Sequence, residues 1–427
     1  MSKAFKIAFA GLGTVGGGAV KAVQAHADRL SARAGRPFEI ALLCDIDEAR
    51  AKSFGIPAVT SDLKALIASN ADVVVELIGG ENGPALTLVE GALAAGKHVV
   101  TANKAMLARH GARLAALAEE KHVALKFEAA VAGGIPIVKA LRETLFVYGV
   151  SAVRGILNGT CNYILTQMEA TGRSFDDVLK DAQRLGYAEA DPTLDIGGGD
   201  TAHKLALLSA LAFGVAPDLD AVSIRGIDRI TPEDIAFARE LGYRIKLLGV
   251  AKATEKGIEQ RVQPAMVRAG TPLADVEGVS NGVVADANEA GPYFFEGRGA
   301  GECPTAGAVV ADLVDIACGR IGPAFGIPSA QLKPLTPAPV GSARSAFYIR
   351  FNVLDVPGVL AEISGRLAEW GVSIESMIQR GRAPGEAVSI VMVTHNTTEG
   401  AVTKALKVIS GSSRVIAAPC VIPMEAK

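Results

Sequence analysis

Short apolar runs alternate with amphipathic stretches over the first third of the chain. The apolar runs are FKIAFAGLG, FEIALLCD, ADVVVELIGG, KHVVTANK and VALKFEAAV. Val- and Ile-rich strands separated by helical patterns are typical of βαβ units, which build a parallel sheet. The pattern therefore predicts an α/β domain with a parallel sheet over residues 1–135.

The pattern changes twice further along the chain. Residues 136–300 show fewer clear strand patterns and several helical ones, such as SFDDVLKDAQRLG and TPEDIAFARELG. Residues 323–345 follow as an extended linker, since five prolines lie between Pro323 and Pro339. Residues 346–427 have the order strand, helix, strand, strand, helix, strand, which predicts a ferredoxin-like unit. Its apolar strands AFYIRFNVLD and AVSIVMVTH are expected to offer open sheet edges, which proteins usually cover.

Composition narrows the possible classes of protein. The 427 residues suffice for roughly three domains of about 150 residues each. A net charge of −2 with dispersed basic residues argues against a nucleic-acid surface. No apolar stretch approaches the length of a membrane span. The five cysteines are scattered without C-x-x-C spacing, so neither a disulfide framework nor a zinc site is indicated. We expect a soluble, cytoplasmic protein.

The first strand ends in a glycine-rich turn that opens a helix. The turn contains Gly11, Gly13, Thr14, Val15 and Gly16. In this context glycines allow a pyrophosphate to approach the helix N-terminus, so the turn predicts a Rossmann-type dinucleotide site. A glycine turn without a ligand is the alternative.

The second strand of this domain ends in an acidic residue, Asp45. An acid at this point can accept hydrogen bonds from both ribose hydroxyls of NAD and would repel the 2′-phosphate of NADP. Of basic residues, only Arg50 follows nearby. The sequence therefore favours NAD over NADP.

An acidic loop runs from Gly186 into a triple-glycine turn and a helix, as GYAEADPTLDIGGGDTAHK. Asp200 and Lys204 stand four residues apart, so a helix would place them on one face. A carboxylate beside an ammonium suits an amino-acid substrate with a hydroxyl or carbonyl that exchanges a proton. A surface loop with an ordinary ion pair is the alternative.

Three further segments carry candidate chemistry. Lys104 follows the strand HVV at the ligand-binding edge of the sheet, although a lysine at a strand end is usually only solvated. The segment from Glu128 to Pro136 could present one carboxylate and several carbonyl oxygens to a hard cation, or could simply cross between domains. A glycine-rich turn at residues 297–301 leads into the helix TAGAVVADLVDIA, whose N-terminus could face a cofactor or be capped by Thr305.

The segment from Gly186 to Lys204 matches G-Y-x-E-x-D-P-x-x-D-x-x-G-x-D-x-x-x-K at every fixed position. It resembles the signature of homoserine dehydrogenases, and the resemblance extends over nearly the whole chain, including Gly155 to Thr160. It implies a Rossmann NAD(P)-binding domain (1–135, with 301–322 packing back on it) and an α+β catalytic and dimerisation domain (136–300). Beyond the linker it implies a C-terminal ferredoxin-like ACT regulatory domain (346–427). Without a preceding kinase-like segment, we expect the monofunctional form.

The resemblance also implies an activity and roles for individual residues. The activity is reversible, NAD(P)-dependent interconversion of L-aspartate 4-semialdehyde and L-homoserine. Catalytic roles are implied for Lys204, Lys104 and Asp200. Substrate contacts are implied for Glu189, Asp200, Asp195 and Lys104. Cofactor contacts are implied for the glycine turn, Asp45, Lys104, Gly186 and Gly301. A structural Na⁺ would be held by Glu128 and the carbonyls of Val131, Gly133 and Ile135.

Partners and alternatives complete these expectations. We expect a homo-oligomer, dimer or tetramer, with L-threonine as a possible effector bound by the ACT domain. The alternatives are a dehydrogenase of another small amino or hydroxy acid, and a non-catalytic sensor of nucleotide and amino acid. The presence of Lys104, Asp200 and Lys204 together disfavours the sensor, since a retired site has no reason to keep all three.

Overall fold

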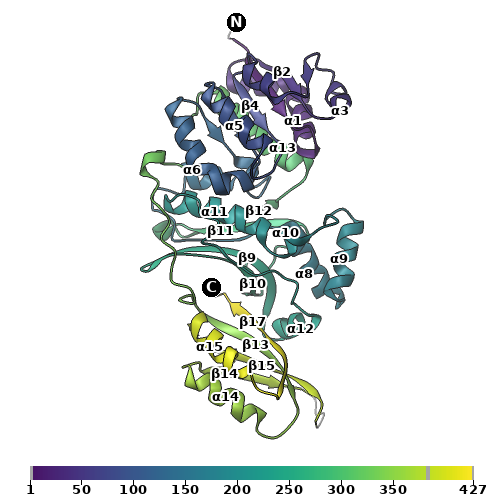
Figure 1. Cartoon of the computed structure of the whole chain (residues 1–427), viewed down its shortest axis with the longest axis vertical. Coiled ribbons are helices and arrows are strands. Elements are labelled where there is room, and N and C mark those ends of the chain that lie inside the picture. Colours follow the sequence, from purple (N-terminus) through teal and green to yellow (C-terminus); the bar gives the residue numbers. More distant parts are fainter. Residues whose placement is uncertain (1–2, 381–384, 426–427) are drawn as a thin grey trace.

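The computed structural model describes residues 3–380 and 385–425. Three parts follow one another along the long axis of the molecule, with the N-terminal part at one end and the C-terminal part at the other (Figure 1). Within the described residues no helix combines the length and the apolar character needed to cross a bilayer.

The N-terminal part is built on a six-stranded sheet in which every pairing is parallel. Its strands, in spatial order, are β3 (Val59–Thr60), β2 (Phe38–Cys44), β1 (Phe5–Ala10), β4 (Val73–Glu76), β5 (His98–Thr101) and β6 (Leu125–Lys126). The order 3-2-1-4-5-6 is that of dinucleotide-binding Rossmann folds. The expected parallel α/β sheet is therefore confirmed.

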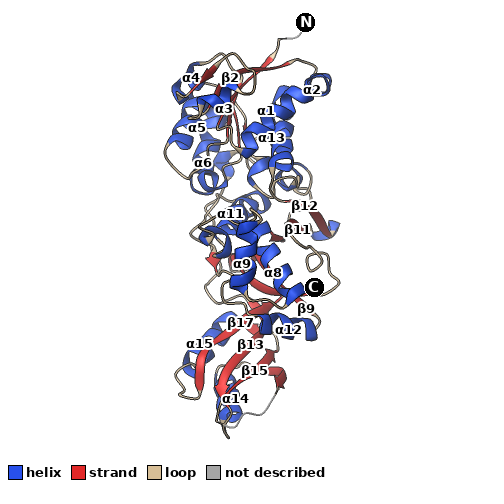
Figure 2. Ribbon diagram, turned by 90° about the vertical axis from the view of Figure 1, so that its right-hand side faces the viewer, coloured by secondary structure: helices blue, strands red, loops and turns tan. Residues whose placement is uncertain are grey.

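Helices cover both faces of this sheet (Figure 2). They are α1 (Thr14–Ala25), α2 (Ala27–Ala34), α3 (Glu48–Lys52), α4 (Leu63–Ala68), α5 (Pro84–Ala94), α6 (Lys104–Glu120) and, from much later in the chain, α13 (Glu302–Ala317). Ile7 and Phe9 pack on the side of α1 and α13, whereas Ala8 and Ala10 pack on the side of α5 and α6. Gly18 of α1 permits the close approach of α13, because a Cβ there would lie 2.6 Å from the Glu302 side chain.

The middle part contains a large, mostly antiparallel sheet that its sequence pattern did not reveal. Its strands are β7 (Ala152–Ile156), β8 (Ser223–Ile224), β9 (Tyr243–Thr254), β10 (Gly257–Arg268), β11 (Ser280–Asp286) and β12 (Pro292–Arg298). One face is covered mainly by α8 (Gly159–Thr171), α11 (Gly199–Phe213) and α12 (Pro232–Glu240). The remaining helical segments are η1 (Glu128–Ala130), α7 (Ile137–Glu143), α9 (Phe175–Arg184), α10 (Thr193–Ile196) and η2 (Asn288–Ala290).

The Pro-rich segment is extended but attached to the body of the protein. It forms isolated bridges at Lys333 and Pro337 and one short helix, η3 (Ser329–Gln331). The carboxylate of Glu119 accepts hydrogen bonds from the backbone and hydroxyl of Ser329. The segment therefore runs along the surface of the two preceding parts.

The C-terminal part has the expected βαββαβ order. Its elements are β13 (Arg344–Leu354), α14 (Val359–Glu369), β14 (Ile374–Gln379), β15 (Ala387–Thr394), the two-residue β16 (Thr397–Thr398), α15 (Glu399–Ile409) and β17 (Val415–Met424). The strand order β17-β13-β15-β14 places the strands of residues 346–355 and 387–395 inside the sheet. The expectation that they form open edges is wrong, since β14 is the outer strand.

The C-terminal part is continuous with the middle part. Strand β17 pairs with β10 through Met424 and Met266, which joins both into one sheet of eleven strands. On β13, Tyr348 and Arg350 both hydrogen-bond to Asp234, a fully buried carboxylate at the start of α12. Buried paired charge of this kind fixes the C-terminal part against the middle part.

Candidate active site

The centre of the site is one carboxylate that contacts two lysines. Asp200 and Lys204 lie one turn apart on α11, and Lys204 Nζ donates to Asp200 Oδ2 at 2.7 Å. Lys104 is the first residue of α6, and its Nζ lies 3.2 Å from Asp200 Oδ1. The sequence-predicted residues Lys104, Asp200 and Lys204 are thus brought together from two parts of the chain.

The segment between β7 and α8 holds this arrangement in place. The carbonyl of Leu157 accepts a hydrogen bond from Lys204 Nζ at 2.6 Å. The Asn158 side-chain amide donates to Asp195 Oδ1 at 2.7 Å and to Asp200 Oδ2 at 2.9 Å. Neither Leu157 nor Asn158 is among the site residues predicted from the sequence.

Burial and neighbouring charges shift the pKa values of the two carboxylates in different directions. Burial alone would raise the pKa of Asp200, but Lys204 and then Lys104 outweigh it and hold the pKa below its ordinary value. For Asp195, burial and then the neighbouring Asp200 raise the pKa, against smaller opposing effects of Asn158 and the two lysines. The site therefore combines a firmly ionised carboxylate with one that is easier to protonate.

The loop before α10 carries the remaining acidic candidates. Glu189 is exposed, and its carboxylate makes no hydrogen bond or ion pair with the rest of the described chain. Asp191 accepts hydrogen bonds from the backbone and hydroxyl of Thr193, so it shapes the loop. Gly186 takes a positive φ of 77° just after α9. The structure does not bring Glu189 or Gly186 into contact with the lysines.

The glycine turn at the start of α1 is tightly packed at two glycines and open at the third. A Cβ at Gly11 would lie 2.6 Å from the carbonyl oxygen of Leu77, and one at Gly16 would lie 1.9 Å from that of Gly11, whereas a Cβ at Gly13 would meet no heavy atom within 4 Å. Gly13 is the N-cap of α1 and no side chain caps this helix. The backbone N–H groups of Thr14 and Val15 are therefore open to an anionic ligand.

Asp45 lies directly after β2 and is almost fully buried. Its carboxylate accepts hydrogen bonds from the backbone of Leu12 at 2.6 Å and of Asp47 at 2.9 Å. Arg50 approaches it at 3.9 Å. Ile46, next to it, is 96% exposed, and an apolar side chain at this edge could lie against an adenine ring. Its exposure was not apparent from the sequence.

A buried carboxylate fixes the loop after β4. Glu76 is fully buried and accepts hydrogen bonds from the backbone of Ile78 and Gly79 and from the hydroxyl of Thr101 at 2.6 Å. Asn103 caps α6 and donates to the carbonyl of Gly80. These contacts tie the loop to the first turn of α6, where Lys104 begins.

The segment proposed for Na⁺ lies where the chain enters the middle part. Glu128 accepts hydrogen bonds from the backbone of Val138 and Lys139, at the start of α7. Burial, and then the neighbouring Asp312, raises its pKa to about 7. Among the described residues no group of three or more His, Cys, Asp or Glu is placed to hold a metal ion.

Two glycine-rich turns meet beside this segment. Gly133 has φ of +48°, and a Cβ there would lie 2.5 Å from the carbonyl oxygen of Gly299. Helix α13 begins at Glu302 with Gly301 as its N-cap, so the expectation that Thr305 caps it is wrong. No side chain caps α13, which leaves its first amides open.

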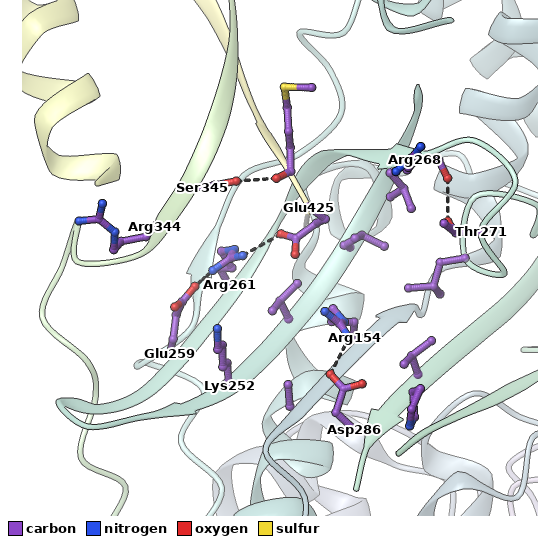
Figure 3. A pocket seen from close by; sticks show the side chains of 18 of the residues that line it. Arg154, Lys252, Glu259, Arg261, Arg268, Thr271, Asp286, Arg344, Ser345 and Glu425 are labelled. Carbon is purple, nitrogen blue, oxygen red and sulfur yellow. Dashed lines mark hydrogen bonds and ion pairs between the residues drawn. The ribbon is translucent and has the colours of Figure 1, made fainter. Parts of the chain in front are cut away.

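A hollow of about 1300 Å³ lies elsewhere, lined by residues of β7, β9 and β10 (Figure 3). There Arg154 pairs with Asp286, and Arg261 lies between Glu259 and Glu425. None of the candidate catalytic residues lines it. This hollow is therefore separate from the candidate catalytic residues.

Comparison with known proteins agrees with the chemistry of this site. Family models match residues 11–128 ("Homoserine dehydrogenase, NAD binding domain"), 136–314 ("Homoserine dehydrogenase") and 347–411 ("ACT domain"). The chain is 44% identical to the homoserine dehydrogenase of Neisseria gonorrhoeae, over 99% of both chains. It is 42% identical to that of Pseudomonas aeruginosa, over 95% of both.

Solved structures agree with this assignment. The crystal structure of a homoserine dehydrogenase from Thiobacillus denitrificans superposes with a TM-score of 0.94, at 43% identity, over 99% of this chain and 98% of that one. Homoserine dehydrogenase of S. aureus gives a TM-score of 0.78 at 30% identity over all of both chains. The chain therefore belongs to the homoserine dehydrogenase family, oxidoreductases that interconvert L-aspartate 4-semialdehyde and L-homoserine with a nicotinamide cofactor.

Proposed function

We propose that Lys204, Lys104 and Asp200 carry out the proton chemistry of this reaction. The observation behind the proposal is that one Asp200 carboxylate contacts both ammonium groups. In reduction, Lys204 gives a proton to the substrate oxygen while Lys104 stabilises the negative charge that develops there. In oxidation, Lys204 removes the proton from the homoserine hydroxyl.

The chain's own residues fit a nicotinamide dinucleotide. The open amides of α1 and the open space beside Gly13 suit a pyrophosphate, while Gly11 and Gly16 allow the tight packing of the turn. Gly301 is proposed to add the open N-terminus of α13, and Gly186 to border the same site. When bound, the cofactor supplies the hydride in reduction and accepts it in oxidation.

The substrate ammonium is assigned to Glu189 and Asp195. The resemblance also implies a substrate contact for Asp200. Its oxygens already pair with Lys104 and accept hydrogen bonds from Lys204 and Asn158, so we assign Asp200 mainly to the lysines. Glu189 is exposed, and Asp195 lies on α10 directly after the loop that carries Glu189, so a charged amino group entering a partly desolvated site would find a partner there.

Glu189→Gln is therefore expected to weaken homoserine binding about tenfold, since a contact with a charged group is lost, while cofactor affinity stays nearly constant. The measurement is the apparent KM for homoserine at saturating cofactor. Asp191→Asn is a matched control from the same loop, because Asp191 bonds only to Thr193 among the described residues. Equal effects of the two changes would remove Glu189 from the assignment.

We propose NAD as the preferred cofactor, with Asp45 as the residue that selects it. NADH should support reduction better than NADPH at equal concentration. Asp45→Ala should bring the kcat/KM values for the two cofactors closer together, because it removes repulsion of the 2′-phosphate. The measurement is the ratio of kcat/KM for the two cofactors. Asp47→Ala removes the same charge two residues away and should leave the ratio closer to that of the unmodified enzyme. An unmodified enzyme that uses NADPH as well as NADH would show that Asp45 does not select NAD over NADP.

A structural Na⁺ remains a proposal for Glu128 and the carbonyls of Val131, Gly133 and Ile135. Each Glu128 oxygen accepts one backbone hydrogen bond, so a carboxylate lone pair remains on each. A cation would also relieve the repulsion between the buried Glu128 and Asp312. These donors fit a hard cation.

The ACT part is proposed to pair between subunits of a dimer or tetramer and to bind L-threonine. The outer position of β14 supports the pairing, because an open edge strand is usually covered. A cytoplasmic location is likewise a proposal.

Millimolar L-threonine is expected to inhibit the full-length enzyme. A protein ending near residue 340 should remain active without this inhibition, although it loses the Arg350 and Tyr348 contacts to Asp234. The measurement is the initial rate with and without threonine, with L-serine as the control amino acid. Full-length enzyme that is insensitive to threonine would exclude the regulatory role and leave pairing to be tested by sedimentation.

A further inference from the structure

The segment that follows β7 contacts both members of the catalytic ion pair through consecutive residues. The Leu157 carbonyl accepts from Lys204, and the next residue, Asn158, donates to Asp200. The same Asn158 nitrogen also donates to Asp195, so one amide bridges two carboxylates from separate helices. Asn158 is 5% exposed.

The orientation of the Asn158 amide follows from its other contact. Its Oδ1 accepts a hydrogen bond from the backbone of Cys161 at 2.8 Å and caps α8. A flipped amide would set its oxygen against two carboxylates and its hydrogens against the Cys161 N–H. Only the observed orientation satisfies all three partners.

We propose that Asn158 is a positioning residue that holds the Asp195 carboxylate beside Asp200 through its bridging amide, so that the substrate ammonium is bound over a wider range of pH. The proposal rests on the assignment of the substrate ammonium to Asp195. Asn158 itself is not required to touch the substrate or the cofactor.

Several charged and titratable groups face Asp195 from the elements around it. Asp200 and Lys204 lie on α11, Lys104 on α6 and Cys161 on α8. Burial and then Asp200 favour the protonated acid, whereas Asn158, Lys204 and Lys104 favour the carboxylate. Removing the amide takes away one stabilising contact, so the pKa of Asp195 rises further. Binding of the ammonium is then lost at a higher pH as the solution is acidified, and is unaffected at high pH.

Asn158→Ser separates the two contacts of this side chain. Serine keeps the α8 cap but lacks the bridging N–H groups. We expect the acidic limb of the kcat/KM profile for homoserine to move up by about one pH unit, a loss of about tenfold at pH values below the limb. The shift of the limb should appear mainly in KM for homoserine. Asn158→Asp, which keeps the shape and the cap but replaces the donor with a charged acceptor, should move the limb further.

Asn162→Ser is the matched control, one turn along the same helix. Asn162 is equally buried and donates to the carbonyls of Val276, Gly278 and Ser280, not to the catalytic carboxylates. Asn162→Ser should lower the melting temperature without moving the acidic limb of the kcat/KM profile. An unchanged limb in both Asn158 variants, or an equal shift in Asn162→Ser, would overturn the proposal.

Asp195→Asn distinguishes failure of this inference from failure of the substrate assignment. If it impairs homoserine binding while the Asn158 variants behave as the unmodified enzyme, only the positioning role is wrong. If it binds homoserine normally, the assignment of the ammonium to Asp195 is wrong and the inference falls with it.

Discussion

Lys204→Ala is expected to lower turnover at least about a hundredfold in both directions, because general acid–base catalysis is typically worth 10²–10⁴ in rate. A lysine ammonium has three N–H donors. In Lys204 two of them are directed to the Leu157 carbonyl and to Asp200, which leaves one for the substrate oxygen. Cofactor affinity should be nearly unchanged, since Lys204 lies on α11 and the dinucleotide turn opens α1.

Lys204→Arg tests whether charge alone is sufficient. Arginine can still pair with Asp200, but its guanidinium does not release a proton in the accessible pH range. Its turnover should therefore fall as far as that of the alanine variant, as measured by steady-state rates alongside NADH binding by fluorescence. Near-native turnover of Lys204→Arg would reduce Lys204 to an electrostatic role.

Asp200→Asn is expected to lower kcat by about two orders of magnitude. Without the carboxylate, the two ammonium groups repel each other and lose the partner that both contact. Both lysines are then no longer held in position for the substrate oxygen. The measurement is steady-state turnover in both directions.

A neighbouring variant separates this effect from simple damage to the fold. Thr201→Ser is the control, because Thr201 is buried on α11 and does not contact Lys104 or Lys204 in the described contacts. Thr201→Ser should leave kcat nearly unchanged. An Asp200→Asn enzyme that turns over as fast as the Thr201→Ser enzyme would show that Asp200 does not position the lysines for catalysis.

The parts of the fold that follow local patterns could be predicted from the sequence. Strands β1, β4 and β5 are apolar runs bounded by turns, and their parallel arrangement follows from the helices between them. The catalytic sheet could not be predicted, because its strands carry buried polar residues that break the apolar pattern. Lys246 on β9 is 1% exposed, and its ammonium donates a hydrogen bond to the Val276 carbonyl. Such a partner is visible only after folding.

In the candidate site, too, contacts within one helix could be predicted from the sequence, whereas contacts between distant segments could not. The spacing of Asp200 and Lys204 predicts their contact, because both lie on one helix. The Leu157 carbonyl has no signal in the sequence, since every residue carries one. The role of Asn158 depends on the meeting of α8, α10 and α11. Sheet edges in the ACT part were predicted wrongly because strand order is a tertiary property, and apolar strands can lie inside a sheet or at its edge.

The most direct test of Lys204 as the proton donor is chemical rescue of Lys204→Ala. The rate of NADH oxidation with aspartate semialdehyde is measured with increasing concentrations of small primary amines of different basicity. The account predicts a low rate without amine and a rise with amine concentration that depends on the pKa of the amine. Turnover close to that of the unmodified enzyme without any added amine would contradict it.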